Sequence, residues 1–252
     1  MTTQLLIYKS AVPVSKARHA DLSVEVRPDF AFSAETNSVP LMAVEFPQAA
    51  AEYAIVFAGD RGEILPHAIL GLRDRENLYV GQRGLWDAQY LPAFIRRYPF
   101  VFSAQGDQLT LCVDEAFPGF NREGRGEPIF AADGSPSAYT QRVLAFLQDY
   151  QAQFQVTQRF CAKLRELGLL EPMQAQITVG SGEKLALGGF MTVDRAKLKA
   201  LPGERLAELA ASDELEMLYL HLHSMRNFER LRGRLDGRLA AAFDQGVPAG
   251  VH

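Results

Sequence analysis

The strongest constraint on the fold is a run of apolar residues that recur at helical spacing over residues 137–167. Ser135 or Ser137 can cap its first turn, and Gly168 provides a stop at the other end. The pattern predicts one helix of about 30 residues, roughly 45 Å long at 1.5 Å per residue. The pattern is weakest over 151–158, so a break there is the alternative. We expect this helix to back a sheet formed by the first half of the chain.

The first half is rich in strand patterns. Runs of β-prone residues predict strands over 52–58, 64–72 and 77–81, and an alternating pattern predicts a hairpin over 100–115. Pro66 lacks the N–H that a ladder needs, so we expect its strand to lie at a sheet edge or to carry a bulge. These segments predict a largely antiparallel sheet.

The region after the long helix predicts a hairpin followed by helices. The hairpin covers 175–194, and its glycine pair at 188 and 189 suggests a bulge or a close backbone approach. Helical patterns follow over 201–212 and 213–235. The second opens with Asp213 and carries a glutamate three residues later, which is typical of a capping box.

The fold class that these patterns predict is α+β: a largely antiparallel sheet backed by a long helix, with a C-terminal hairpin and helices. The Gly- and Pro-rich segment 115–136 marks a soft boundary between a strand-rich part, 1–134, and a second part, 135–252. One compact domain and two closely joined lobes both fit this division.

Charge and hydropathy exclude several classes of partner. The 26 basic and 30 acidic side chains give no general attraction to nucleic acid or to an anionic membrane. No apolar stretch reaches the roughly 18 residues that a membrane-spanning helix needs, and the start of the chain lacks the pattern of a signal peptide. We therefore expect a cytoplasmic protein, in which Cys112 and Cys161 are buried thiols without a disulfide.

Two adjacent arginines, Arg96 and Arg97, interrupt an aromatic and aliphatic segment. They could form an internal clamp, an anion site or a partner surface. If a short helix starts at Pro92, both point away from its apolar face, and the hairpin end offers Asp114 and Glu115 as bidentate partners. We favour this clamp and expect Arg97→Ala to cost on the order of 1 to 3 kcal/mol of stability.

Candidate catalytic groups are scattered. His221 and His223 form an H-x-H pair, but in a helix their rings point roughly 200° apart, which predicts one core histidine and one surface histidine instead of a chelate. His19 and His67 have no local ligand spacing.

Two carboxylates have a more suggestive spacing. Glu45 and Glu52 would share one face if the turn at Pro47 is helical, as a metal pair or a general acid and base would require. The alternative is that one of them pairs with an arginine and the other faces water.

A mobile surface loop is the favoured interpretation of the segment around Arg122 and Arg125. Its glycines could form an anion-binding nest, but no phosphate-binding, nucleophile-elbow or zinc motif is present, and we predict no cofactor and no metal. The loop arginines and aromatic residues near Trp86 and Tyr90 form a candidate surface for a protein or peptide partner.

Several segments, taken in order, resemble the SapC family of bacterial proteins, which is named for a surface-layer-associated protein. They are "NSVPLMAVEFPQAAAEYAIVF", "ILGLRDRENLYVG", "GLWDAQYLPAFIRRYPFVFS", "LCVDE" and "GEPIFAADGSPSAY". With "HLHSMRNFERL", the similarity extends from His19 to Leu231. The resemblance implies an association with a surface layer, or with outer-membrane receptors, flavin-dependent halogenases and cupin-like hydroxylases encoded nearby. It carries over no catalytic residue.

Two hypotheses follow. The first is an accessory or binding protein without an established reaction, in a surface-layer or outer-membrane-associated pathway. The second is an enzyme, such as a metal-dependent oxygenase or hydrolase that acts on a peptide or small molecule. Its site would need at least three of the scattered histidines and glutamates, among them His19, Glu45, Glu52, His67 and His221, to converge in one pocket.

Overall fold

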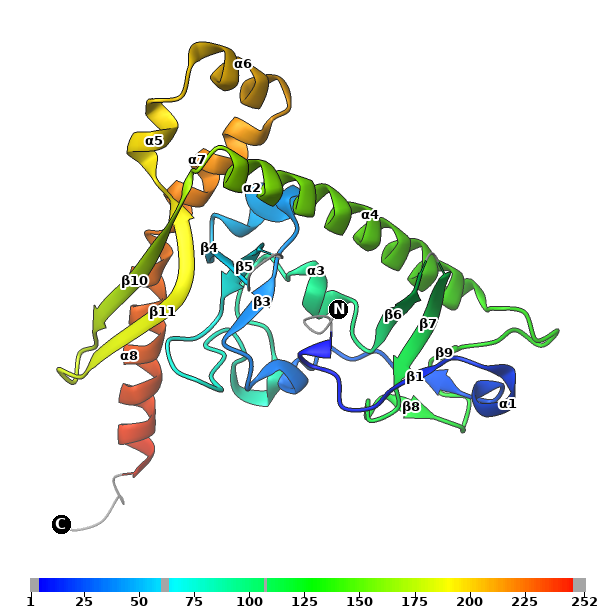
Figure 1. Cartoon of the computed structure of the whole chain (residues 1–252). Coiled ribbons are helices and arrows are strands. Elements are labelled where there is room, and N and C mark those ends of the chain that lie inside the picture. Colours follow the sequence, from blue (N-terminus) through cyan, green and yellow to red (C-terminus); the bar gives the residue numbers. More distant parts are fainter. Residues whose placement is uncertain (1–4, 60–63, 107, 247–252) are drawn as a thin grey trace, which may run out of the picture.

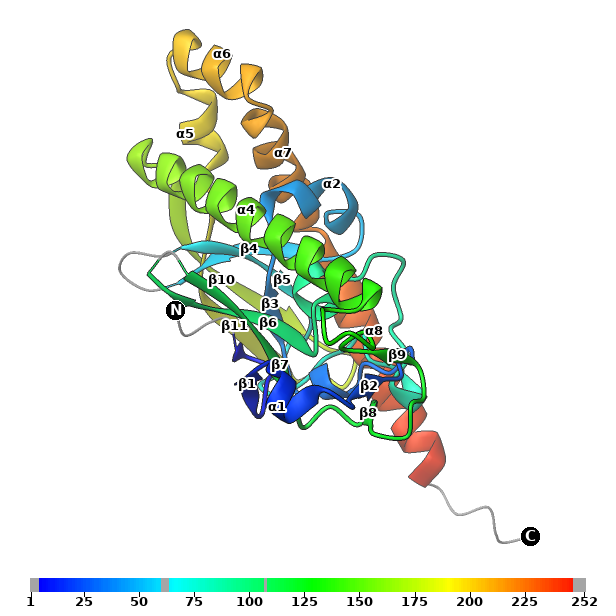
Figure 2. The ribbon, with the colours of Figure 1, turned by 90° about the vertical axis from the view of Figure 1, so that its right-hand side faces the viewer.

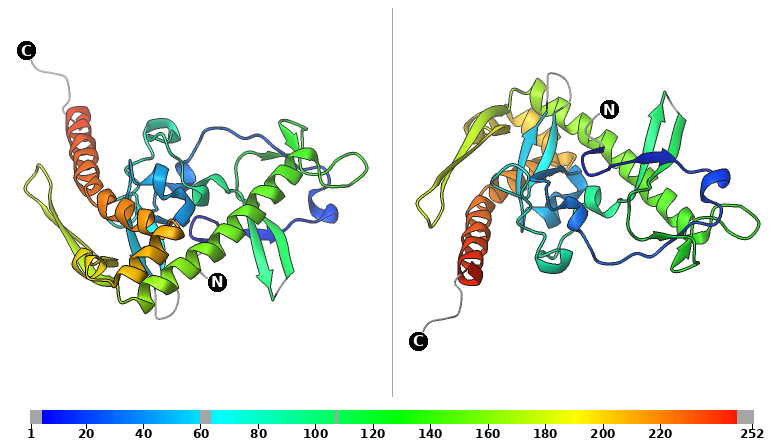
Figure 3. Two further views of the ribbon diagram at one scale, coloured as in Figure 1. Left: turned by 90° about the horizontal axis from the view of Figure 1, so that it is seen from above. Right: turned by 90° about the horizontal axis from the view of Figure 1, so that it is seen from below.

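The long helix organises the molecule. The structure, a computed structural model, describes residues 5–59, 64–106 and 108–246, with side chains as far as Ala241. Helix α4 (Ala138–Glu166) crosses over three separate sheets, and the view from above shows it running diagonally across the molecule (Figures 1 and 3).

Helix α4 begins and ends where its sequence predicts. The Ser137 hydroxyl accepts the Thr140 N–H at 3.1 Å, and Gly168 adopts a φ of 65°, which favours glycine. The helix continues without interruption through 151–158, so the alternative of a break is wrong. The apolar spacing was therefore sufficient to define the largest element of the fold.

A five-stranded antiparallel sheet lies under one end of α4. Its strand order is β10-β11-β4-β5-β3. The strands are β3 (Ser38–Pro40), β4 (Ala54–Ala58), β5 (Leu65–Ile69), β10 (Leu170–Thr178) and β11 (Lys184–Val193). Between β10 and β11 the register shifts where Gly189 has a φ of 82°, which confirms the predicted bulge.

Two smaller sheets lie under the other end of α4. One has the order β1-β7-β6 and the other the order β8-β2-β9. Their strands are β1 (Ala11–Pro13), β2 (Ser23–Val24), β6 (Phe100–Gln105), β7 (Gln108–Asp114), β8 (Phe120–Asn121) and β9 (Glu127–Pro128). The β6–β7 pair is the predicted hairpin. The long helix, the antiparallel sheets and the C-terminal hairpin together confirm the predicted α+β class.

The remaining helices are short, except for α8. They are α1 (Lys16–His19), α2 (Phe46–Ala49), α3 (Ala93–Arg96), α5 (Arg195–Lys199), α6 (Gly203–Ala211), α7 (Glu214–Ser224) and α8 (Asn227–Gly246), with 3-10 turns η2 (Ala31–Ser33), η3 (Ala43–Glu45) and η4 (Gln82–Gly84). Helices α5 and α6 lie beyond one end of α4, as Figure 2 shows from the side. The β10–β11 hairpin runs beside α8, where Phe190 stacks on Phe228 with ring centroids 6.1 Å apart.

Two hydrophobic clusters hold these elements together, and α4 contributes to both. The larger cluster surrounds Phe57 of β4 and includes Phe160 of α4 and Leu231 of α8. The smaller one joins Phe100 of β6 to Leu147 of α4. Burial of apolar side chains between α4 and the three sheets is the main force that fixes the helix across them.

Three local predictions are wrong. Residues 77–81 form no strand and make an isolated bridge from Val80 to Trp86. Pro66 lies in β5, an inner strand, but β3 pairs only with 67–69, so Pro66 stands past the end of that ladder. The predicted helix 213–235 is divided into α7 and α8, and Asp213 has a φ of 58° without a side-chain cap.

The structure also bears on two predictions made from the sequence: the burial of the cysteines and the lack of a membrane-spanning helix. Cys112 and Cys161 are buried and free, as expected. None of the helices within the described ranges combines the length and hydrophobicity that crossing a lipid bilayer demands.

Candidate functional site

The two adjacent arginines have different environments. Arg96 is exposed, whereas Arg97 is only 4% exposed. The Arg97 guanidinium carbon lies 4.2 Å from the Phe94 ring centroid, 4.9 Å from that of Tyr150 and 5.7 Å from that of Tyr8. The expectation that both arginines point away from the apolar face is therefore wrong for Arg97.

The acidic partners proposed for the clamp are also in different environments. Asp114 is fully buried and accepts the N–H groups of Lys9 at 2.8 Å and Ser10 at 2.9 Å. Glu115 instead bonds Arg18 and lies 3.2 Å from Nε2 of His19. The clamp remains a prediction for the buried residues, Arg97 and Asp114.

A hollow of about 290 Å³ opens beside Arg96, between α4 and the turn η3–α2. We call it the Arg96 pocket; among the residues that line it are Met42, Glu45, Tyr90, Arg96, Phe146, Tyr150 and Gln153. The Arg96 guanidinium carbon lies 5.4 Å from the Phe146 centroid and 5.9 Å from that of Tyr90, which is within cation–π range. An exposed cation thus stands between two aromatic rings.

Glu45 fixes the floor of the Arg96 pocket. Its carboxylate, 4% exposed, accepts the Tyr90 hydroxyl at 2.7 Å and the N–H groups of Ala93 and Met42, both at 2.8 Å. Burial raises the pKa of Glu45, and the two N–H donors oppose that rise. Because three donors hold the carboxylate, we interpret Glu45 as a positioning group for Tyr90 and Arg96.

Tyr90 connects the Arg96 pocket to Trp86. The Trp86 indole N–H lies 3.0 Å from the Tyr53 hydroxyl and 3.2 Å from the Tyr90 carbonyl oxygen. The Tyr53 hydroxyl also donates to that carbonyl. Trp86 and Tyr90 are half-buried, and the polar atom of the indole points inward, so the expectation of exposed aromatic residues needs correction.

Glu52 takes part in a different hollow from Glu45. It lines an open depression of about 570 Å³ with Trp86, Arg230 and Arg234, and both its carboxylate oxygens accept the Gln89 N–H at 3.0 Å. The two glutamates thus hold different backbone segments, and the structure does not bring them together as an acid–base pair.

The loop arginines pair locally. Arg122 bonds Asp21, and Arg125 bonds Glu123 and approaches Glu25 at 3.7 Å. The strands beside this loop, β8 and β9, lie under the opposite end of α4 from β4 and β5 (Figure 1). Arg122 and Arg125 therefore form a separate surface from the Arg96 pocket.

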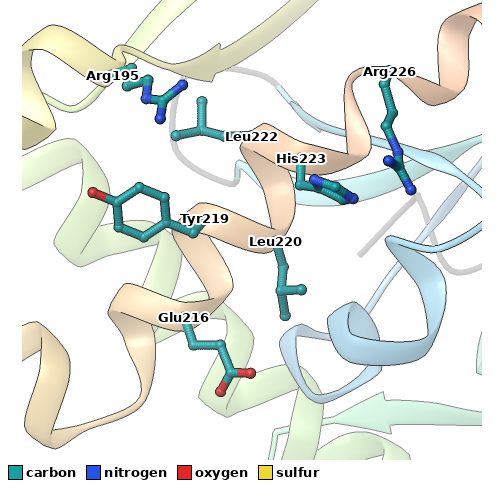
Figure 4. Close-up of a pocket in the computed structure, with 7 residues that line it drawn as sticks. All are labelled: Arg195, Glu216, Tyr219, Leu220, Leu222, His223 and Arg226. Atoms are coloured by element: carbon teal, nitrogen blue, oxygen red, sulfur yellow. The ribbon is translucent and has the colours of Figure 1, made fainter.

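The H-x-H pair is divided between core and surface, as its helical spacing predicts. His221 is fully buried; its Nε2 accepts the Val193 N–H at 3.0 Å, and its Nδ1 donates to the Ile55 carbonyl at 2.8 Å. Burial lowers the pKa of His221 to about 4. His223 is exposed and lines an open hollow of about 620 Å³ with Arg195 and Arg226 (Figure 4).

His19 and His67 also have structural roles. Nδ1 of His19 accepts the Ser15 N–H at 3.1 Å, and burial lowers the pKa of His67, whose Nδ1 lies 3.2 Å from the Leu65 carbonyl oxygen. Within the described residues, no group of three or more His, Cys, Asp or Glu side chains could hold a metal ion.

Sequence patterns indicated Tyr90, Arg96 and Glu45 as candidate residues, but they did not predict that Phe146 and Tyr150 of α4 line the same pocket. Phe146 and Tyr150 entered the prediction only as members of the apolar face of the long helix. A tyrosine on such a face is a usable signal, since its hydroxyl needs a partner when buried.

Comparison with known protein families adds one finding. The family model SapC matches residues 14–231, which is most of the chain. The chain belongs to the SapC family. The Arg96 pocket and the network from Trp86 to Glu45 both lie within the range that matches SapC. No curated protein and no solved structure matches this SapC-family chain.

Proposed function

We propose that the protein is a non-catalytic accessory protein that holds a peptide or protein partner through an acidic group at the Arg96 pocket. The observation that carries the proposal is the exposed Arg96 guanidinium between the rings of Tyr90 and Phe146. A guanidinium has five N–H donors in a planar fork that suits a carboxylate.

The surroundings of Arg96 support a binding role. The Arg96 guanidinium carbon lies 5.9 Å from the centroid of the Tyr90 ring, whose hydroxyl donates to Glu45. Fixing the cation before a partner arrives lowers the entropy cost of association. Apolar walls of Met42 and Phe146 beside the charge would accept the aliphatic part of a peptide.

The alternative, a metal-dependent oxygenase or hydrolase, receives less support. Such a site needs convergent ligands or an acid and base that face one cavity. His19, His67 and His221 are each tied to a different part of the structure, and Glu45 and Glu52 line different hollows. We therefore favour the binding function.

A place in a surface-layer or outer-membrane-associated pathway is part of this proposal, as is a cytoplasmic location. The pathway is supported by membership of the SapC family alone.

Arg96→Gln tests the proposal. We expect it to reduce capture of the partner from extracts of the producing bacterium at least tenfold, on the order expected for losing one charged hydrogen-bonded contact. The readout is quantitative mass spectrometry of proteins retained by the immobilised chain, followed by titration of the acidic peptide so identified.

Arg142→Gln is the matched control. Arg142, on α4, is exposed like Arg96, and its guanidinium carbon lies 5.9 Å from the Tyr139 ring centroid. It does not line the Arg96 pocket. Equal capture by wild type and Arg96→Gln would contradict the proposal, whereas loss in Arg96→Gln alone would support it.

A further inference from the structure

Strand β10 forms one edge of the five-stranded sheet. It is 9 residues long, and the hairpin that it makes with β11 projects away from α4 (Figure 1). Among the described residues, β11 is the only strand that pairs with it. The outer side of β10, which we call the β10 edge, therefore presents a row of backbone N–H and C=O groups that a further strand can bind.

Hydrogen bonds at both ends of the hairpin show which residues of β10 face this edge. Val179 donates its N–H to the Glu183 carbonyl at 3.0 Å, and Asp194 donates to the Leu169 carbonyl at 2.8 Å. Backbone groups in an antiparallel ladder point alternately toward and away from the partner strand. Both bonds therefore assign the odd-numbered residues of β10 to the β11 ladder. The residues whose N–H and C=O groups point outward include Gln174, Gln176 and Thr178.

The β10 edge lacks most of the features that keep sheet edges from pairing, which are charged side chains, prolines and bulges. No charged residue lies between Glu171 and Glu183 in the sequence. Pro172 stands near the start of the strand, and the bulge inserts its extra residue into β11, since 173–175 of β10 face 187–190. A strand added to the edge would thus meet neither a charge nor an inserted residue over the rest of β10.

The two faces of β10 differ, and a second copy of the strand matches both. Ala175 and Ile177 belong to the larger hydrophobic cluster, whereas Gln174, Gln176 and Thr178 are exposed. About a two-fold axis at Gln176, a second copy running antiparallel would place its Thr178 opposite Gln174. On the buried face the same register places its Ile177 opposite Ala175. The pairing joins polar to polar and apolar to apolar side chains, as a self-complementary interface requires.

We propose that β10 pairs with β10 of a second copy of this chain, antiparallel about a two-fold axis at Gln176, so that their two sheets become one. A strand from another protein would need a sequence that suits both faces, whereas a second copy supplies it by identity. This inference goes beyond the proposed function, because the β10 edge contains no residue of the Arg96 pocket.

Gln176→Pro tests the inference by sedimentation velocity and native mass spectrometry over a series of protein concentrations. We expect wild type to form a dimer. The substitution removes an outward N–H, and with it both hydrogen bonds that Gln176 exchanges with its own copy, so dimerisation should weaken at least about tenfold. The β11 ladder keeps its bonds, and Pro172 already occupies an outward position of the same strand.

A pair of charge variants keeps the test independent of any effect of proline on folding. Gln176→Lys and Gln176→Glu each place like charges face to face across the axis, so each protein alone should be monomeric where wild type is dimeric. Mixing the two should restore a heterodimer, which a folding defect would not do. Ala186→Lys is the matched control, since it adds the same charge to the exposed residue that faces Gln176 on β11, one strand inside the edge.

Three results would overturn the inference: a wild-type chain that stays monomeric, a dimer that withstands Gln176→Pro, or charge variants that stay apart when mixed. Loss of the dimer in Ala186→Lys to the same extent as in Gln176→Lys would also contradict it, because the effect would then not belong to the edge. Arg96→Gln should leave dimerisation unchanged, so failure of this inference is distinguishable from failure of the proposed function.

Discussion

Arg97→Ala is expected to lower the free energy of unfolding by about 3 kcal/mol, in the range measured when one partner of a buried charged interaction is removed. The guanidinium lies among the rings of Phe94, Tyr150 and Tyr8, and the change removes both that cation and its packing. Denaturant unfolding of the two proteins measures the difference.

Arg96→Ala provides the internal comparison for that experiment. Arg96 is the exposed neighbour on the same turn, and its loss removes only exposed cation–π contacts, so it should lower stability by about 1 kcal/mol, well below the effect of Arg97→Ala. A double-mutant cycle between Arg97→Ala and Asp114→Ala then tests the clamp, for which we expect a coupling above about 1 kcal/mol. An unchanged melting temperature in Arg97→Ala would refute the clamp.

Acidification should destabilise the protein through His221. Burial holds the pKa of His221 at about 4, against an ordinary value of 6.5. Between these values the unfolded chain binds a proton that the folded protein does not, so the free energy of unfolding falls as the pH drops through this window. At about 1.4 kcal/mol per pKa unit, His221 contributes about 3 kcal/mol at pH 7 that is lost by pH 4.

The H-x-H pair supplies its own control for this prediction. His221→Gln should remove that part of the pH dependence, whereas His223→Gln, two residues away on the exposed side of α7, should retain it. Denaturant unfolding at several pH values between 4 and 7 gives the comparison. Parallel pH profiles for wild type and His221→Gln would show that another group is responsible.

Local patterns predicted the elements whose limits depend on nearby residues. Ser137 and Gly168 define both ends of α4, and the alternating residues of the β6–β7 hairpin define its register. The division of 213–235 into α7 and α8 escaped prediction because its helical spacing continues across the turn at Met225 and Arg226. Packing against β4 and β11, which comes from other parts of the chain, fixes α7 there.

The candidate site shows the same limit. Arg96 and Tyr90 were recognisable from the sequence, because an arginine in an aromatic segment needs either a partner for its charge or access to solvent. The burial of Arg97 was not, because the rings of Tyr8 and Tyr150 that surround it come from the N-terminal segment and from α4. The inward hydrogen bonds of Trp86 likewise depend on Tyr53, which precedes it by 33 residues.

A photo-crosslinking amino acid at Gln153, which lines the Arg96 pocket from α4, would show whether a partner occupies that pocket in the producing bacterium. The same group at the exposed Gln155, outside the pocket, is the control. We predict a crosslink from position 153 to an acidic segment of one protein, absent from position 155 and lost when Arg96→Gln is added. Equal crosslinking from both positions, or a crosslink that persists in Arg96→Gln, would contradict a binding function for this pocket.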